Sequence, residues 1–270
     1  MRRGWTIIEM TCVIAILTLL VSILLPGLRH TNREAMHLHT GSNLRQLARA
    51  ATLYSVERSG MFPPGLLHGL NNDAQSGDVR AWDWWKRPDG TVQPGPVWAL
   101  TDTTDPRGIL QCPLAQDQHA GWNGDPVTGY NYNVAFIAAE AASPWTAQPG
   151  MGAWDLVIEK PNLGGLGWLT RAQCRRAGTT ALFGLGGRLG GVNKFMRSPV
   201  NIGGMETAYA GGQAFPDGVT HVAWVDGHIA RRRHPFRGQL WDDLPNWMTS
   251  QLEWPRNGFL SDDARAYDPR

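Results

Sequence analysis

The feature that most constrains this chain is an apolar run near its beginning. From Trp5 to Leu28 the only charged side chain is Glu9, and Arg2 and Arg3 precede the run. A helix of about 20 apolar residues crosses the roughly 30 Å hydrocarbon core of a bilayer, so residues 5–28 are expected to span a membrane. The two arginines predict a cytoplasmic N-terminus, which sends the rest of the chain to the outer side.

Glu9 is the exception within this run. A carboxylate in a membrane helix is costly unless it meets a partner, so an intramembrane acid is a candidate functional residue. Cleavage between Gly4 and Trp5 would create a positively charged N-terminus that could serve as that partner.

The residues around this bond carry a family resemblance. The segment Gly4-Trp-Thr-Ile-Ile-Glu9 resembles the class III signal of type IV pilins and type II secretion pseudopilins. In that family a prepilin peptidase removes the leader, here residues 1–4, and methylates the new N-terminus, here Trp5 in place of the usual Phe. The resemblance implies that Glu9, fifth in the processed chain, pairs with the N-terminus of a neighbouring subunit.

Two other interpretations of the run stay open. A secretory signal peptide would have a shorter apolar core and a small-residue cleavage site after it, and residues 26–30 contain no such pattern. An ordinary signal anchor would leave Glu9 without a role.

The helical pattern continues beyond the membrane run and becomes amphipathic. Apolar residues recur at helical spacing, whereas Arg45, Gln46 and Arg49 lie on the other side. The apolar set is Leu44, Leu47, Ala48, Ala51 and Tyr54. We therefore expect one helix from Trp5 to about Arg58, with residues 29–58 as its amphipathic half, ended by Ser59-Gly60. Pro26, where many pilins have a helix-bending proline, predicts a kink or local melting at residues 24–28.

Residues 59–270 are expected to form a globular domain of the α+β class. The chain contains 32 Gly, 18 Pro and 13 Trp, which favours a small antiparallel sheet with long loops packed on the helix. The formal net charge of +2 implies no nucleic-acid partner. Trp82, Trp84, Trp85, Trp98 and Trp122 are interpreted as core anchors, with a sugar-binding platform as the alternative. The tail, residues 241–270, is expected to wrap the domain and fray at its end.

Several segments of this domain resemble one large bacterial pilin-like family, whose C-terminal signature is His, nine residues, then Asp-Gly. They are residues 42–47, Cys112-Pro113, the predicted strand 130–134 and the segment 220–230. Asp226-Gly227 matches the signature, but Pro216 stands where its histidine belongs. A further buried strand is expected at residues 179–184.

Asp226-Gly227 also predicts a hairpin with a two-residue type I′ loop. Such a loop would pair Val225 with His228 and Trp224 with Ile229, placing Trp224 and Ile229 on one buried face.

Two further kinds of site deserve consideration. Imidazoles and carboxylates at Asp217, His221, Asp226 and His228 could bind zinc, calcium or another metal ion, although turn chemistry alone explains Asp226. We therefore assign no cofactor. Cys112 and Cys174 would both lie on the oxidising side of the membrane, and whether they form a disulfide depends on their geometry. Cys12 lies within the membrane run.

No catalytic motif of the G-x-S-x-G, H-E-x-x-H or CxxC type is present, so no enzyme is expected. The resemblance implies a structural subunit of a type IV pilus or a type II secretion pseudopilus. It would be anchored in the bacterial inner membrane, with its globular domain in the periplasm or outside the cell. Its partners would be prepilin peptidase, the lipid bilayer, other subunits and an inner-membrane assembly platform. The alternative is an anchored binding module whose Trp-rich domain recognises glycan or another envelope component.

Overall fold

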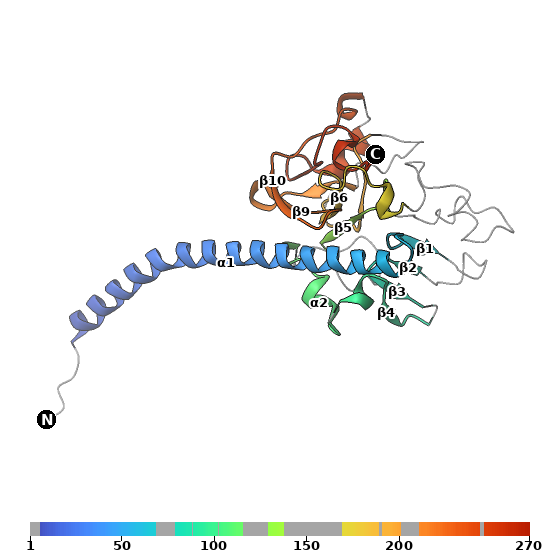
Figure 1. The fold of residues 1–270 in the computed structure, drawn as a ribbon. Coiled ribbons are helices and arrows are strands. Elements are labelled where there is room, and N and C mark those ends of the chain that lie inside the picture. The colour runs from blue at the N-terminus through green and yellow to red at the C-terminus, as the bar shows by residue number, and fades with distance from the viewer. Residues whose placement is uncertain are drawn as a thin grey trace. The chain divides into compact units, whose positions relative to one another are not determined.

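The computed structural model of the chain describes residues 6–68, 79–87, 89–101, 103–115, 129–137, 169–188, 191–200, 211–243 and 246–270. One long helix, α1 (Ile7–Glu57), is followed by small sheets and short helices, so the α+β class is confirmed (Figure 1). The chain divides into two compact units, residues 1–39 and 40–270. Gly4 and Trp5 lie outside the described residues.

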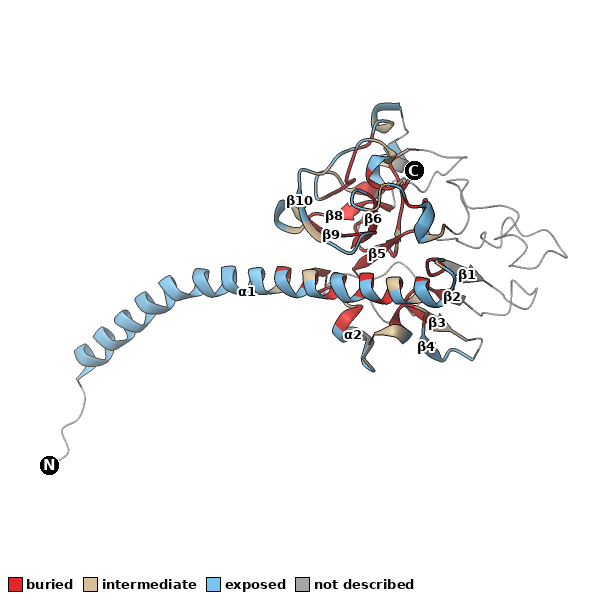
Figure 2. Cartoon of the chain, viewed as in Figure 1, coloured by how far each residue is buried: buried red, intermediate tan, exposed pale blue. Residues whose placement is uncertain are grey.

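The first unit contains the apolar part of α1. Every residue from Thr6 to Ala35 is exposed (Figure 2). A kink or local melting was expected at Pro26. The helix continues without a break through this residue, so local melting does not occur. The N-terminal half of α1 instead curves smoothly (Figure 1). A proline removes one backbone hydrogen bond, and a helix of 51 residues tolerates that loss.

The end of α1 is the spine of the second unit, as its amphipathic pattern predicts. Leu44, Leu47, Ala48 and Ala51 are buried, and Tyr54 is partly buried. The helix ends at Glu57, just before the expected stop. There the N–H of Gly60 donates to the carbonyl of Ser55 (2.7 Å), and both Ser59 and Gly60 have positive φ.

Among the residues that the structure describes, three sheets build the rest of this unit. The largest has the order β10-β9-β6-β5-β7 and consists of β5 (Tyr130–Asn133), β6 (Ala181–Leu185), β7 (Phe195–Met196), β9 (Val219–Trp224) and β10 (Ile229–Arg233). The four-stranded sheet contains β1 (Leu66–His68), β2 (Val79–Ala81), β3 (Trp84–Lys86) and β4 (Val92–Pro94), and β8 (Gln213–Ala214) pairs with β11 (Asn257–Gly258). The strand pairs are antiparallel except β5 with β7, so the expected purely antiparallel sheet is corrected to a mixed one.

Short helices occupy several of the connections. The α-helical turns are α2 (Pro106–Ile109) and α4 (Asn246–Thr249). The 3-10 helices are η1 (Trp98–Leu100), η2 (Pro113–Ala115), η3 (Arg171–Gln173), η5 (Pro216–Gly218), η6 (Trp241–Asp243), η7 (Ser250–Leu252) and η8 (Ala264–Ala266).

The five-stranded sheet has a core on each face. The helix-side core joins the buried residues of α1 to Trp82, Tyr132, Phe183 and Ala223. The tail-side core joins Phe136, Met196, Trp224, Phe259 and Tyr267. Strand β5 alternates between the two faces, as its sequence predicts, and both faces are buried because one is covered by α1 and the other by the tail.

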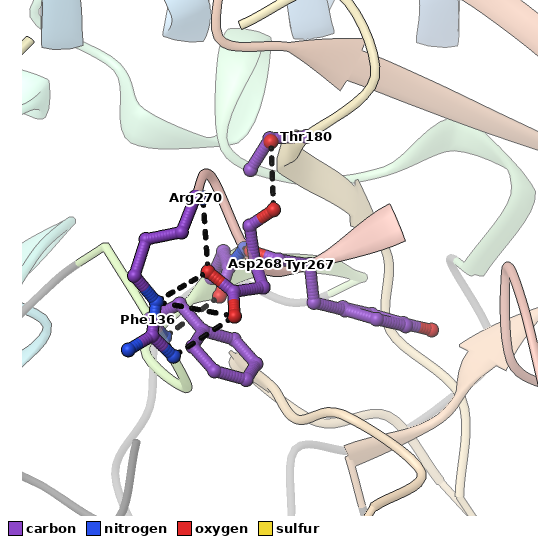
Figure 3. A network of polar contacts seen from close by, with 6 residues as sticks. Phe136, Thr180, Tyr267, Asp268 and Arg270 are labelled. Atoms are coloured by element: carbon purple, nitrogen blue, oxygen red, sulfur yellow. Dashed lines mark hydrogen bonds and ion pairs between the residues drawn. The ribbon is translucent and has the colours of Figure 1, made fainter. Parts of the chain in front are cut away.

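The tail wraps the domain, but the expected fraying is wrong. Tyr267 is fully buried, and its hydroxyl oxygen accepts a hydrogen bond from the N–H of Leu260 (2.8 Å). Asn133 donates to the carbonyl of Tyr267 (2.9 Å), and Thr180 donates to the carbonyl of Asp268 (3.4 Å). Arg270 pairs with Asp268 beside the ring of Phe136, so side chains of the sheet bind the tail almost to its last residue (Figure 3).

Of the five tryptophans interpreted as core anchors, Trp82, Trp84 and Trp98 are buried, and Trp224 is buried as well. The indole of Trp82 donates to the carbonyl of Lys194 (3.2 Å), whereas Trp85 is only partly buried. Because their faces are covered, the buried tryptophans form no platform for a sugar. Trp122 lies outside the described residues.

Near these tryptophans, Lys194 and Asp83 form an ion pair with both side chains buried. The ammonium of Lys194 also lies over the ring of Trp84, 5.5 Å from its centroid.

Candidate functional site

The first turn of α1 is closed by a reciprocal pair of side chains. Both the backbone N–H and the hydroxyl of Thr6 donate to Oε2 of Glu9, at 2.8 and 2.9 Å. The N–H of Glu9 donates in return to the Thr6 hydroxyl oxygen (3.2 Å). This arrangement is a capping box, in which Thr6 is the N-cap and Glu9 occupies the third helical position. The two side chains together therefore satisfy two backbone N–H groups at the start of the helix, those of Thr6 and Glu9.

The capping box corrects the predicted start of the helix, which is Ile7 rather than Trp5. The sequence carries the signal for it, since Thr-x-x-Glu before an apolar run is the pattern of a capping box. The two hydrogen bonds that Glu9 accepts both fall on Oε2, and among the described residues Oε1 has no hydrogen-bond partner. Oε2 of Glu9 is thus used within the helix, and Oε1 can accept a hydrogen bond from another molecule.

The surface of the apolar run is suited to lipid. Its large side chains are exposed, from 42% at Val13 to 84% at Ile7. Hydroxyl groups within the run donate to carbonyls of the preceding turn: Thr11 to Ile8 (2.9 Å), Thr18 to Ala15 (2.9 Å) and Ser22 to Leu19 (2.7 Å). Since a bilayer core offers no hydrogen-bond partners, this internal satisfaction lowers the cost of placing the helix in lipid. Among the described helices, α1 is long and apolar enough to cross a membrane.

A shallow apolar recess lies along one side of this helix. Its lining is Leu17, Thr18, Val21, Ser22, Leu25, Pro26 and Arg29. These residues recur at intervals of three or four along the run and so form one stripe on α1. Side chains of another helix can pack against a stripe of this kind.

The hairpin expected at Asp226-Gly227 is present, but its predicted register is wrong by one residue. Ile229 pairs with Ala223 instead of Trp224. The N–H of Trp224 donates to the carbonyl of His228 (3.0 Å). Trp224 therefore lies opposite His228, and their rings stack with centroids 5.7 Å apart.

The loop of this hairpin has three residues, 225–227, rather than two. The N–H of Gly227 donates to the carbonyl of Trp224 (2.9 Å), and Gly227 has φ of +95°, whereas Asp226 does not have positive φ. A type I turn followed by a left-handed glycine is a common three-residue hairpin. As a result Trp224 enters the tail-side core while Ile229 packs against the helix-side core, so the predicted shared face is wrong.

The four candidate metal ligands are distributed along the hairpin. Asp226 and His228 are in contact at its tip, with Oδ1 2.6 Å from Nδ1. His221 is buried in the middle of β9, and Asp217 precedes that strand. Among the described residues no group of three or more His, Cys, Asp or Glu could hold a metal ion. The Asp226–His228 contact is a turn interaction, reinforced by a hydrogen bond from the N–H of His228 (3.1 Å).

The possible disulfide between Cys112 and Cys174 is not formed, and both are free thiols. Each sulfur contacts a different segment: Sγ of Cys112 lies 3.8 Å from the hydroxyl of Thr40, and the thiol of Cys174 donates to the carbonyl of Thr170 (3.7 Å). Burial raises the pKa of both thiols to about 11. These cysteines therefore act as buried side chains of the core, with little thiolate at neutral pH.

Comparisons with known proteins give no match: no family model, no curated protein and no solved structure is similar to this chain.

Proposed function

We propose that this protein is a pilin-like structural subunit that assembles into a type IV pilus or a type II secretion pseudopilus. The observation that carries the proposal is an exposed apolar helix with a single acid in its first turn, one oxygen of which has no hydrogen-bond partner in the described chain. In a plain anchor the acid would serve only to cap the helix, through Oε2. A helix that must align with copies of itself also has a use for the second oxygen of that acid.

Processing would supply the partner of the acid. Prepilin peptidase cuts between Gly4 and Trp5 and methylates the new N-terminus. The amine produced is positively charged, and in the sequence it belongs to the residue directly before Thr6 of the capping box. In a filament the amine of one subunit donates to Oε1 of Glu9 in the next, which fixes the axial register between them.

Assembly would exchange lipid for protein around α1. As a single subunit in the bacterial inner membrane, the helix presents its apolar side chains to lipid, with the globular domain on the outer side. After extraction by the assembly platform those side chains pack on neighbouring helices, and the recess along Leu17 to Arg29 receives part of that contact. Each subunit keeps its apolar surface out of water in both states.

Mass spectrometry of the N-terminus of the mature protein tests this proposal. We expect a chain that begins with N-methylated Trp5. Gly4→Ala should block cleavage and leave the leader attached, which gives a slower band on a gel beside the wild type. A native protein that retains residues 1–4 would contradict the proposal.

The alternative is a membrane-anchored module that binds an envelope component through its globular domain. An anchor exchange distinguishes the two functions, because the binding activity of such a module would survive when residues 5–28 are replaced by an unrelated membrane anchor. Assembly of a pilin-like subunit would not survive that exchange.

A further inference from the structure

The contact between Lys194 and Asp83 brings a primary amine against a carboxyl group inside the globular unit. Nζ of Lys194 contacts Oδ2 of Asp83, and the two side chains are only 8% and 2% exposed. Both groups are therefore largely shielded from bulk water. An ammonium and a carboxylate are costly to bury as charges, and neither group is charged once the proton moves from the amine to the acid.

Aromatic side chains lie beside this contact. The ring centroid of Trp84 is 5.5 Å from Nζ of Lys194. Trp84 is buried together with Ala81, and Phe195, the residue after Lys194, packs against this small cluster. A reaction that releases water is favoured in such a place, because the surroundings hold little water to reverse it.

The backbone holds both residues in position. The carbonyl of Lys194 accepts hydrogen bonds from the N–H of Tyr132 (2.9 Å) and from the indole of Trp82 (3.2 Å). The carbonyl of Asp83 accepts a hydrogen bond from the N–H of Gly95 (3.0 Å). Two groups that a fold keeps in contact react as though each were present at a very high concentration.

The choice of lysine at position 194 is informative. The sequence contains three lysines, Lys86, Lys160 and Lys194, among its 25 basic residues. Arginine suits a buried ion pair better, because its guanidinium binds both carboxylate oxygens and stays charged. Lysine instead ends in an amine, which is a nucleophile once it has lost its proton. This arginine-rich chain thus places one of its few amines against a buried acid.

We infer that Lys194 and Asp83 become joined by an intramolecular isopeptide bond, with their ion pair as the starting state. After proton transfer within the pair, the neutral amine attacks Cγ of the protonated Asp83 side chain. The bond from Cγ to the hydroxyl oxygen breaks, and the hydroxyl leaves as water with a proton from the amine. An amide between Nζ and Cγ remains, and no oxidant, reductant or further reactant is consumed.

The bond would connect the two larger sheets of the globular unit. Asp83 lies between β2 and β3 of the four-stranded sheet, and Lys194 directly precedes β7 of the five-stranded sheet. The two residues are 111 positions apart in the sequence. Because the three cysteines are free, the isopeptide bond would supply a covalent link that the thiols do not. This link belongs to the globular unit whether or not the protein forms filaments.

Mass spectrometry of the intact, denatured full-length protein tests the inference. The wild type should be about 18 Da lighter than its sequence predicts, since one isopeptide bond releases one water. After digestion with trypsin, the peptide 81–86 should be recovered joined to the peptide 189–197. On a denaturing gel the wild type should migrate faster than a chain without the bond, because a cross-link makes the unfolded chain more compact.

Lys194→Arg is the matched control, because arginine keeps the positive charge beside Asp83 but stays protonated and is not a nucleophile. This variant should have the full mass of its sequence and give no joined peptide. Any change at the N-terminus is common to both proteins and cancels in the comparison. Lys194→Arg is also the reference for the energetics of the ion pair itself, since it keeps the two charges without the bond.

Two results would overturn the inference. One is a wild type that has its full mass, and this measurement decides the matter even where the variant fails to fold. The other is the same loss of mass in Lys194→Arg. Dehydration at an Asp-Gly pair such as Asp226-Gly227 also removes one water, and it would persist in that variant.

Discussion

The proposed pairing of Glu9 predicts that its charge, and not its role in the capping box, controls assembly. Two variants separate these roles. Glu9→Gln removes the charge but keeps an acceptor at the third helical position, where glutamine also completes a capping box. Thr6→Ala keeps the charge but removes the hydroxyl that makes two of the three capping hydrogen bonds.

The expected effects differ in size. Between packed apolar helices an amine and a carboxylate attract each other more strongly than in water, and a neutral side chain at position 9 would leave the neighbouring amine buried without a counter-ion. Loss of an N-cap side chain typically costs about 1 kcal/mol. Glu9→Gln should therefore abolish filaments at normal expression levels, while Thr6→Ala should reduce them only about fivefold.

Membrane fractionation and filament recovery measure the two steps separately. Both variants should insert into the membrane as efficiently as the wild type, because neither shortens the apolar run. Sheared filaments should be recovered from Thr6→Ala and not from Glu9→Gln. Normal filaments from Glu9→Gln would refute the charge argument, and equal losses in both variants would show that the capping box itself is what assembly needs.

Three further predictions concern the globular unit. Tyr267→Phe leaves a buried backbone N–H without its acceptor and should lower the free energy of unfolding by about 1–3 kcal/mol, measured by urea denaturation. Lys194→Met leaves the carboxylate of Asp83 buried without its ion-pair partner and should cost about 3–5 kcal/mol, most of which Asp83→Leu in the same chain should restore. For Asp226, desolvation is the largest single cause and raises the pKa, but the hydrogen bonds and the charge interaction with His228 together lower it below its usual value. The hairpin should therefore be most protected from hydrogen exchange above the usual aspartate pKa and lose protection as the pH falls through the lowered pKa, a dependence that Asp226→Asn should remove.

The helix could be predicted almost completely from the sequence because its information is local. The spacing of Leu44, Leu47 and Ala51 defines one buried face, and Ser59-Gly60 defines the stop. Only the first turn was placed wrongly. The apolar pattern extends back to Trp5, but the helix begins at Ile7 because the Thr6 side chain caps its first turn.

The hairpin shows where local information ends. Asp-Gly is compatible with a two-residue loop and with a three-residue loop that has glycine in the left-handed position. The choice between them decides which face of the sheet receives Trp224. That choice depends on the tail-side core, whose members Phe259 and Tyr267 come more than thirty residues later in the chain.

Other features depend entirely on distant segments. The parallel pairing of Tyr132 with Phe195 joins strands that the sequence separates by a long connection. The ion pair of Asp83 with Lys194 spans 111 residues. No sequence motif marks either of these two contacts. Each forms only because the completed fold brings together residues that lie far apart in the chain.

The capping box also bears on how assembly begins. A side chain that becomes ordered at an interface costs about 0.5–1.5 kcal/mol. In the single subunit Glu9 is already held by Thr6 through Oε2, so most of that ordering precedes assembly. In the proposed filament Oε1 receives the neighbouring amine without loss of the cap, since the two interactions use different oxygens. The proposal therefore makes capping and pairing cooperative rather than competing, and this is why Thr6→Ala should weaken assembly slightly instead of strengthening it.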